Sequence, residues 1–357
     1  MIYRAIGIMS GSSLDGLDIA FVEFLETGGK WSYEIIQADC VKYSKEWEDN
    51  LRNAVTLSAL DYQLLHTTYG HYIGQQVNAF IEKHGLEHKV QLIASHGHTT
   101  FHIPKQQLTA QLGDGAAIAA ETNLHVVSDL RSLDVALGGQ GAPIVPVGEK
   151  LLFTGYDYFL NIGGIANISI KESGRHVAYD VCAANRVLNM LAAENGSAYD
   201  DGGKLAAAGN LDTYLLNELN SLDYYSQPYP KSLPNSFGTD LVFPIIKGSG
   251  LSLQDGLRTY VEHIAVQISN TIAAPQETKK MLVTGGGAYN TFLMERLKEV
   301  LLPLNIDVAV PDEKTVQYKE AVIMALIGLL RWREEENVLA SVTGASRASV
   351  GGALWIG

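Results

Sequence analysis

The sequence of 357 residues contains only two cysteines, Cys40 and Cys182. Two thiols cannot form a disulfide framework or a structural zinc site, so small disulfide-rich and zinc-stabilised folds are excluded. A chain of this length buries roughly three quarters of its unfolded surface. We therefore expect its stability to come from apolar cores, and its thiols to be reduced.

Long apolar segments are also missing. The longest, residues 321–330, contains ten residues, whereas a helix needs about 20 to cross a bilayer. The first residues, MIYRAIGIMSGSS, lack the charged segment and the continuous apolar stretch of a signal peptide. We therefore expect a cytoplasmic protein with no membrane partner.

Basic residues are outnumbered, because 26 Lys and Arg face 39 Asp and Glu and leave a net charge of −13. A protein that binds nucleic acid or an anionic membrane needs a basic face, so neither is an expected partner. A phosphate ligand is compatible with this charge, because backbone N–H groups hold phosphate without lysine. The 35 glycines gather in short clusters that suit such loops.

Two parts of the chain share one expected order of elements. Strands are expected at 2–9, 17–25 and 31–43, and again at 158–162, 168–170 and 176–181. Each set is an antiparallel meander with a glycine turn after its first strand, whereas in a dinucleotide-binding fold the glycine loop leads into a helix. The repetition predicts a duplicated two-domain α/β fold. Further strands are expected at 92–95, 281–284 and 306–310, and helices within 47–84, from about 290 and over 320–333.

The turn after the first strand reads Gly11-Ser12-Ser13-Leu14-Asp15-Gly16. Its glycines and hydroxyls expose donors of the kind that cradle phosphates, and Asp15 has the chemistry to hold magnesium. Asp18, at the start of the second strand, is a second candidate for magnesium or for a water bound to it. An ordinary hairpin turn is the alternative interpretation.

Glycines recur at two further turns. Gly163-Gly164 occupies the equivalent place in the second meander, and Gly285-Gly286-Gly287 joins an expected strand to an expected helix. A pair of glycine hairpins that clamps a triphosphate is typical of the actin and sugar-kinase superfamily. Taken alone, each turn is equally compatible with a purely structural role.

Three polar residues are candidates for work on a substrate. Asp180 lies near the end of an expected strand, where a carboxylate is well placed as a general base. A helix N-cap is the alternative role for Asp180. Arg131 lies in a segment that could bind a polar sugar or act as an interdomain hinge, and Thr99 could also reach a ligand. A zinc site is not favoured, because the three nearby histidines lie on an expected loop without a carboxylate at a recognised spacing: His96, His98 and His102.

These motifs together resemble the anhydro-N-acetylmuramic acid kinase family from end to end. The matching segments include GIMSGSSLDGLDIA from Gly7, SHGHTTFHIP from Ser95, DLRSLDVALGGQGAPIVP from Asp129, NIGGIANIS from Asn161, VTGGGAYNTFLMERL from Val283 and KEAVIMAL from Lys319.

The resemblance implies an actin-like, ribonuclease H-like sugar-kinase fold with two domains, an interdomain cleft, ATP and Mg²⁺ as cofactors, and a homodimer. We expect residues 1–133 with 343–357 to form one domain and 134–342 the other. The implied reaction acts on 1,6-anhydro-N-acetylmuramic acid, a small sugar from the cell wall. Water opens the anhydro bridge, the freed 6-oxygen takes the γ-phosphate, and the product is N-acetylmuramic acid 6-phosphate.

The resemblance also implies roles for single residues. Asp180 matches the family's base, and three residues fall where the family contacts the sugar: Thr99, Arg131 and Glu320. The family's ATP-phosphate segment matches Gly11, Ser12, Ser13, Leu14, Asp15, Gly16, Leu17 and Asp18.

The chain differs from the family's usual pattern at the base. DTGPGN is usual there, and this chain has Asp180-Val181-Cys182-Ala183-Ala184-Asn185; His98 also replaces a usual Gln. Two alternatives therefore stay open: a kinase for a different sugar, and a catalytically weak sensor of nucleotides or cell-wall fragments.

Overall fold

The computed structural model describes the whole chain except residues 12–13, 15, 173–174, 230 and 235. The contacts between described residues divide it into two compact units. Unit 1 comprises Met1–Thr154 and Tyr318–Gly357, and unit 2 comprises Gly155–Gln317. The domain boundaries expected at 133/134 and 342/343 differ from these limits and stay a prediction.

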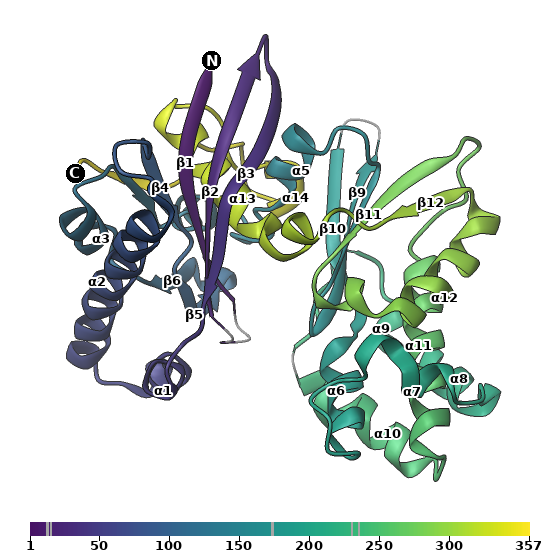
Figure 1. Cartoon of the computed structure of the whole chain (residues 1–357). Helices are drawn as coiled ribbons and strands as arrows, with labels where there is room; N and C mark the ends of the chain where they lie inside the picture. The colour runs from purple at the N-terminus through teal and green to yellow at the C-terminus, as the bar shows by residue number, and fades with distance from the viewer. Residues whose placement is uncertain (12–13, 15, 173–174, 230, 235) are drawn as a thin grey trace. The chain divides into compact units, whose positions relative to one another are not determined.

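The sheet of unit 1 has the strand order β13-β7-β4-β1-β2-β3. Figure 1 labels four of these strands, β4, β1, β2 and β3. Its first three strands form the antiparallel meander, β4 and β7 continue parallel to β1, and β13 closes the edge antiparallel to β7. A separate hairpin pairs β5 with β6. The strands are β1 (Ile2–Ser10), β2 (Leu17–Thr27), β3 (Lys30–Val41), β4 (Leu92–Ser95), β5 (His98–Ile103), β6 (Leu108–Leu112), β7 (Val126–Ser128) and β13 (Ala353–Trp355).

The sheet of unit 2 has the order β10-β9-β8-β11-β12. Again the first three strands form an antiparallel meander, and two later strands lie parallel to the first. The strands are β8 (Tyr158–Ile162), β9 (Ile165–Glu172), β10 (Arg175–Ala183), β11 (Lys279–Thr284) and β12 (Ile306–Ala309). Both sheets therefore share one core order, and the predicted duplicated, ribonuclease H-like fold class is confirmed.

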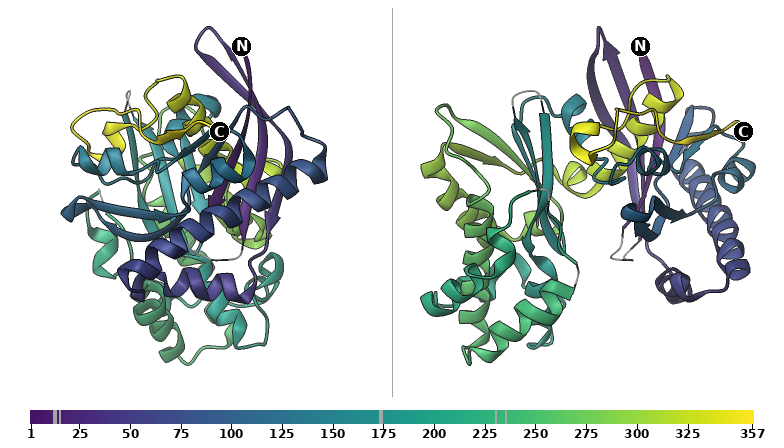
Figure 2. Two further views of the ribbon diagram at one scale, coloured as in Figure 1. Left: turned by 90° about the vertical axis from the view of Figure 1, so that its left-hand side faces the viewer. Right: turned by 180° about the vertical axis from the view of Figure 1, so that it is seen from behind.

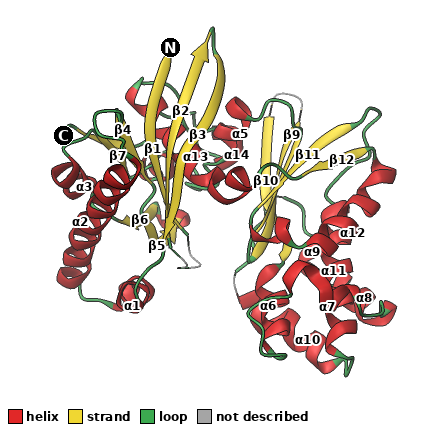
Figure 3. Ribbon diagram, in the orientation of Figure 1, coloured by secondary structure: helices red, strands yellow, loops and turns green. Residues whose placement is uncertain are grey.

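Helices fill the connections between the strands (Figure 3). Those of unit 1 are α1 (Lys45–Asn53), α2 (Ala59–His84), α3 (Gly115–Thr122), α4 (Ser132–Ala136), α5 (Pro146–Leu152) and α14 (Ala340–Thr343). Those of unit 2 are α6 (Asn185–Ala193), α7 (Lys204–Ala207), α8 (Thr213–Asn220), α9 (Asp223–Ser226), α10 (Phe243–Gly248), α11 (Leu253–Ser269) and α12 (Thr291–Leu301). The long helix α13 (Glu313–Trp332) runs from unit 2 into unit 1.

Caps set where several helices begin. The hydroxyl of Ser58 accepts the N–H of Asp61 at the start of α2, and Gly85 ends that helix in the left-handed conformation. The apolar residues predicted a helix that starts at residue 320, whereas α13 starts at Glu313. The Asp312 carboxylate caps this earlier start, because it accepts the N–H and hydroxyl of Thr315 at 3.0 and 2.8 Å. Within the described chain, no helix is both long and apolar enough to span a bilayer.

Helices cover both faces of the unit 1 sheet, as the two further views show (Figure 2). Alternate residues of β1 point to opposite faces. Ile6 and Ile8 join a buried cluster with Tyr69 of α2. Gly7 faces α13, and a Cβ at Gly7 would lie 1.8 Å from the backbone oxygen of Ala321. The glycine is therefore required by the close approach of a helix backbone to the sheet.

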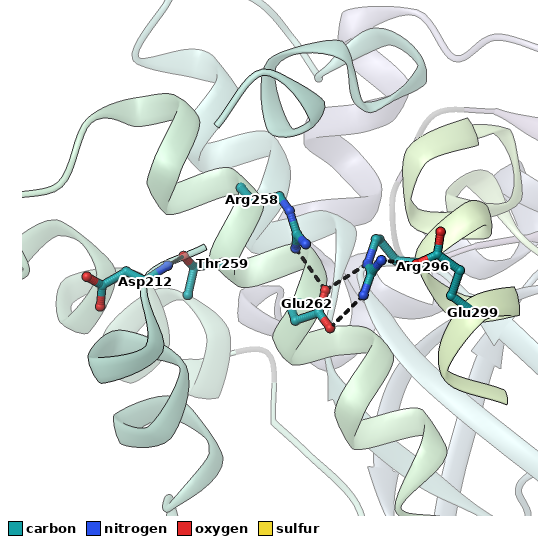
Figure 4. A network of polar contacts seen from close by, with 6 residues as sticks. All are labelled: Asp212, Arg258, Thr259, Glu262, Arg296 and Glu299. Atoms are coloured by element: carbon teal, nitrogen blue, oxygen red, sulfur yellow. Dashed lines mark hydrogen bonds and ion pairs between the residues drawn. The ribbon is translucent and has the colours of Figure 1, made fainter. Parts of the chain in front are cut away.

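The core of unit 2 lies between its sheet and helices α11 and α12, where Leu160 and Val283 pack with Tyr260 and Leu297. A charged network also links the two helices (Figure 4).

In this network the Glu262 carboxylate accepts Nε and Nη2 of Arg296 at 2.9 and 3.1 Å, and Nη1 of Arg258 at 2.8 Å (Figure 4). Burial by itself raises the pKa of Glu262, but the two arginines together bring it below its usual value. This network therefore stabilises the fold above the ordinary pKa of the carboxyl and weakens as the pH falls through the lowered value.

We expect Gly7→Ala to lower the free energy of unfolding by about 2 kcal/mol or more, because overpacking against backbone cannot relax by a side-chain movement. The matched control is Gly155→Ala, since a Cβ at Gly155 would meet no atom within 4 Å. Urea denaturation of both variants measures the difference. Equal stabilities would contradict the packing of α13 on β1.

Candidate functional site

The candidate site of unit 1 lies at one edge of its sheet. Strands β1, β4 and β7 are parallel, so their carboxyl ends meet at the same edge, which is where ligands bind in open α/β sheets. The N–H of His96, which follows β4, donates to the oxygen of Ile8 near the end of β1 at 3.1 Å. The predicted site residues of unit 1 follow these strand ends, apart from Glu320 on α13.

The β1–β2 turn contains the expected phosphate segment, of which Ser12, Ser13 and Asp15 lie outside the described residues. Leu14 has φ 59° although its side chain is 7% exposed, an uncommon conformation for a bulky buried residue. Its N–H donates to the oxygen of Gly11 at 3.4 Å. The turn therefore holds a backbone shape that local preference disfavours, as turns at functional sites often do.

Packing explains the last part of this turn. A Cβ at Gly16 would lie 2.6 Å from Sγ of Cys40, so this glycine is needed for contact with β3. Leu17 is fully buried, whereas Asp18 is partly exposed and lies opposite Met9 in the register. Of the predicted magnesium ligands, Asp18 is thus the one that the structure describes.

Arg131 and Thr99 are brought together as the sugar-binding prediction requires. Nη1 of Arg131 donates to Oγ1 of Thr99 at 3.0 Å, Nε donates to the oxygen of Gly141 at 2.6 Å, and Nη2 lies 3.3 Å from Nδ1 of His102. Arg131 is only 8% exposed, and among the described residues it forms no ion pair. Burial lowers its pKa to about 10, against the opposing charge of Asp134. A buried cation without a carboxylate is suited to bind an anionic ligand.

Glu320 is partly exposed on α13. Its neighbour Lys319 forms a buried ion pair with Glu149 of α5 at 2.8 Å. Burial raises the pKa of Glu320, as does the charge of Glu149, while Lys319 lowers it. In the described part of the chain, no hydrogen bond or ion pair joins Glu320 to Thr99 or Arg131.

The prediction that the three histidines lie on a loop is wrong for two of them, because His98 and His102 lie on strand β5. The strand was missed because it pairs only with β6, in a hairpin outside the main sheet. Each ring has its own contact: Nδ1 of His96 with the oxygen of Gly97, Nδ1 of His98 with the Ser10 hydroxyl, and Nδ1 of His102 with the Thr109 hydroxyl.

In unit 2 the two glycine turns come together. A Cβ at Gly285 would lie 2.5 Å from Oδ1 of Asn161, and one at Gly287 would lie 2.3 Å from Cγ2 of Ile162, so both glycines allow the β11 turn to pack on the end of β8. The backbone around Gly163 and Gly164 accepts N–H groups from the start of α6 at 2.9 to 3.4 Å. The turn itself is shorter than expected, since β9 already begins at Ile165.

Asp180 lies on the edge strand β10, directly opposite Asn167, which in turn lies opposite Asn161. Residues directly opposite one another share a face of the sheet, so these three polar side chains form a row near the glycine turns. The alternative role of Asp180 as a helix N-cap is wrong, because α6 begins at Asn185 and Ala184 occupies the cap position.

Tyr224, Lys231 and Leu233 hold Asp180 in place. Oδ2 of Asp180 accepts the N–H of Leu233 at 2.9 Å, its N–H donates to the oxygen of Lys231 at 3.3 Å, and its oxygen accepts the hydroxyl of Tyr224 at 2.7 Å. Burial raises the pKa of Asp180, and the Leu233 N–H partly opposes the rise. A carboxylate with a raised pKa is a stronger base, as a general base requires.

Arg186 is a candidate that the sequence reasoning missed. Its Nε is buried and has no hydrogen-bond partner among the described residues. A Cβ at Gly164 would lie 3.6 Å from this Nε, so the guanidinium lies beside the glycine turn. The only signal in the sequence is a single arginine in the first turn of a helix, which does not distinguish a ligand contact from an exposed side chain.

Duplicated meander sheets with glycine turns beside a carboxylate define a member of the actin and sugar-kinase superfamily. The family model described as anhydro-N-acetylmuramic acid kinase matches residues 3–357. Relatives with that name include proteins from Photobacterium profundum, 33% identical over 99% of both chains, and Aliivibrio fischeri, 35% identical over 98% of both. The chain belongs to the anhydro-N-acetylmuramic acid kinase family, and it is therefore a phosphotransferase with an alcohol group as acceptor.

Solved structures that resemble the chain are more distant. The activator of the 2-hydroxyisocaproyl-CoA dehydratase from Clostridium difficile, with bound ADPNP, has a TM-score of 0.47 at 12% identity and covers 93% of this chain and 96% of its own. A ROK family glucokinase from Streptomyces griseus, in complex with glucose and AMPPNP, has a TM-score of 0.42 at 11% identity and covers 91% of this chain and 99% of its own.

We expect Asp180→Asn to raise the free energy of unfolding at pH 7. The folded-state pKa of this carboxyl is raised, so the wild-type protein loses stability as the pH rises from the ordinary value of 3.8 through the folded value. The Asn variant lacks this loss and keeps an oxygen for the Leu233 N–H.

Chemical denaturation at pH 4.5 and pH 7 measures the effect. Asp223→Asn, an exposed acid on the nearby helix α9, is the matched control. If Asp180→Asn instead destabilised the fold at pH 7, Asp180 would be a structural residue rather than a buried base.

Proposed function

We propose that this kinase opens 1,6-anhydro-N-acetylmuramic acid with water and phosphorylates its 6-oxygen with ATP, in the recycling of the cell wall. The observation that carries the proposal is the match of the family model to residues 3–357. It is supported by relatives of that name which align over at least 97% of this chain at 32–35% identity.

Asp180 is the proposed general base. It accepts a proton from water, whose oxygen bonds to the anomeric carbon as the bond from that carbon to the 6-oxygen breaks. The 6-oxygen takes the γ-phosphoryl group, and ADP leaves. The raised pKa of Asp180 supports this role. In its described contacts only Oδ2 accepts a hydrogen bond, which leaves Oδ1 for the water.

Arg131 and Thr99 are the proposed sugar-binding residues. N-acetylmuramic acid carries a lactyl carboxylate, and the buried Arg131 is a cation without a described carboxylate partner. A charge-assisted contact between the two is among the stronger hydrogen bonds in proteins. Glu320 is proposed as a third contact on the resemblance alone.

The glycine turns are the proposed phosphate-binding segments. Gly163 and Gly164 have no left-handed φ, and a Cβ at either would find its nearest atoms at 3.5 and 3.6 Å. Neither conformation nor packing requires glycine there, which supports close approach of a ligand. The guanidinium of Arg186 adds a cation beside this turn.

Asp18, with Asp15, is the proposed ligand pair for Mg²⁺. The donor set fits this ion, because Mg²⁺ is usually bound by one or two carboxylates together with phosphate oxygens and waters. When bound, the ion neutralises charge on the transferring phosphoryl group. Mg²⁺, a cytoplasmic location and a homodimer are proposed on the resemblance alone.

We expect incubation with ATP, Mg²⁺ and 1,6-anhydro-N-acetylmuramic acid to give a product heavier than the sugar by one phosphate group and one water. Mass spectrometry with ¹⁸O-labelled water tests this directly, because the label enters at the anomeric carbon. A product heavier by phosphate alone would favour a different sugar-kinase reaction. ATP hydrolysis with the sugar untouched would contradict the proposed substrate.

We expect Arg131→Gln to raise KM for the anhydro-sugar by about 10- to 100-fold, the effect typical of one hydrogen bond to a charged group. The variant should discriminate less against 1,6-anhydro-N-acetylglucosamine, which lacks the lactyl carboxylate. Arg347→Gln, at an exposed arginine of the same unit, is the control. An unchanged preference between the two sugars in Arg131→Gln would show that the carboxylate binds elsewhere.

A further inference from the structure

His98 occupies a position between two parts of the candidate site. It directly precedes Thr99, and its Nδ1 lies 3.2 Å from the hydroxyl of Ser10, the residue before the phosphate-segment glycine Gly11. The side chain is 6% exposed. Such a buried imidazole needs partners for both ring nitrogens, since one is a donor and the other an acceptor.

A chain of hydroxyl groups decides which nitrogen carries the proton. The Tyr43 hydroxyl donates to Oγ of Ser10 at 2.8 Å, so its single proton is used there. The contact of 2.6 Å between the hydroxyls of Tyr43 and Tyr69 therefore has Tyr69 as donor. Ser10 is buried and accepts from Tyr43, which leaves its own proton to donate to Nδ1 of His98. Every hydroxyl of this chain, Tyr69–Tyr43–Ser10, is then satisfied with the imidazole proton on Nε2.

Burial keeps the side chains of His98, Tyr43 and Tyr69 neutral. It lowers the pKa of His98 to about 4, raises that of Tyr43 to about 12, and raises that of Tyr69 well above its usual value. At neutral pH the ring is therefore an imidazole with one N–H, and this N–H has no partner among the described residues. A donor without an acceptor in the protein can donate to an oxygen that a ligand supplies.

We propose that His98 binds the ligand through its Nε2–H, which the hydroxyl chain holds in place, and that the acceptor is an anionic oxygen. The sugar carboxylate beside Thr99 and Arg131 and a phosphate oxygen beside Gly11 are the two sources of such an oxygen. The inference rests on the proposed function for the placement of these ligands. His98 would thereby take part in binding at the point where the phosphate segment and the sugar-binding residues meet within unit 1.

The first test uses the protein labelled with ¹⁵N-histidine, with the His98 signals assigned by comparison with His98→Gln. Nuclear magnetic resonance at pH 7 should show the proton on Nε2. Addition of the anhydro-sugar alone and of a non-hydrolysable ATP analogue alone should shift the Nε2–H signal in one of the two titrations, which identifies the source of the acceptor. A proton on Nδ1, or an Nε2–H signal that neither ligand moves, would overturn the inference.

The second test compares two replacements of His98. Gln retains an oxygen that accepts from Ser10 and an N–H donor, so His98→Gln should keep kcat/KM within a few-fold. Leu retains only bulk, so His98→Leu should lose about 10- to 100-fold, as expected for one hydrogen bond to a charged acceptor. The loss should appear in KM for the ligand that moved the Nε2–H signal. Equal losses in both variants would point to a structural role.

Tyr69→Phe is the matched control, because it removes one hydroxyl of the same chain and leaves the Nε2–H in place. The kcat/KM of Tyr69→Phe should fall less than that of His98→Leu, even if the two variants have the same melting temperature. If the wild-type protein fails to turn over the anhydro-sugar, the proposed function fails, and the nucleotide titration still decides the role of His98. If turnover is normal and Nε2–H is unmoved by both ligands, only this inference fails.

Discussion

The parallel pairing of the first strand of each meander with the strands that follow is the constraint on which the rest of the structure depends. In unit 1 this pairing aligns β1 with β4 and β7, and in unit 2 it aligns β8 with β11 and β12. Parallel strands bring segments that are distant in the sequence to one edge of a sheet. Thr99 and Arg131 meet in this way, as do the turns at Gly163 and Gly285.

Close packing preserves this alignment. Helix α13 lies so near β1 that its backbone occupies the space of a side chain at Gly7, and a Cβ at Gly328 of the same helix would lie 2.4 Å from the Cβ of Ala94 on β4. These contacts limit sliding of the strands, because a shift by one residue would drive a side chain into backbone. The strand ends beside which Ser10, His98 and Arg131 lie are therefore held by close packing of α13 on the sheet.

Desolvation is the common feature of the candidate site residues. Burial disfavours the charged form of Asp180, Arg131 and His98 alike, so each pKa moves in the direction that favours the neutral group. Such groups reduce stability unless they are paired, and Arg131 has neutral partners in place of a carboxylate. Groups of this kind are frequent at functional sites, because a ligand supplies the missing interaction.

The sequence by itself determined the duplicated meanders, because alternating apolar residues and glycine turns are local signals. It also determined the family, since matching motifs run along the chain, and it named Thr99, Arg131 and Asp180 as candidates. It left a helix N-cap open as the alternative role of Asp180 and placed His98 on a loop, because a chain read locally does not reveal which strand edge is paired. Tertiary structure alone decided the contact of Thr99 with Arg131, the burial of Nε of Arg186 and the hydroxyl chain that reaches His98. These depend on burial and on contacts between residues far apart in the chain, which no local pattern encodes.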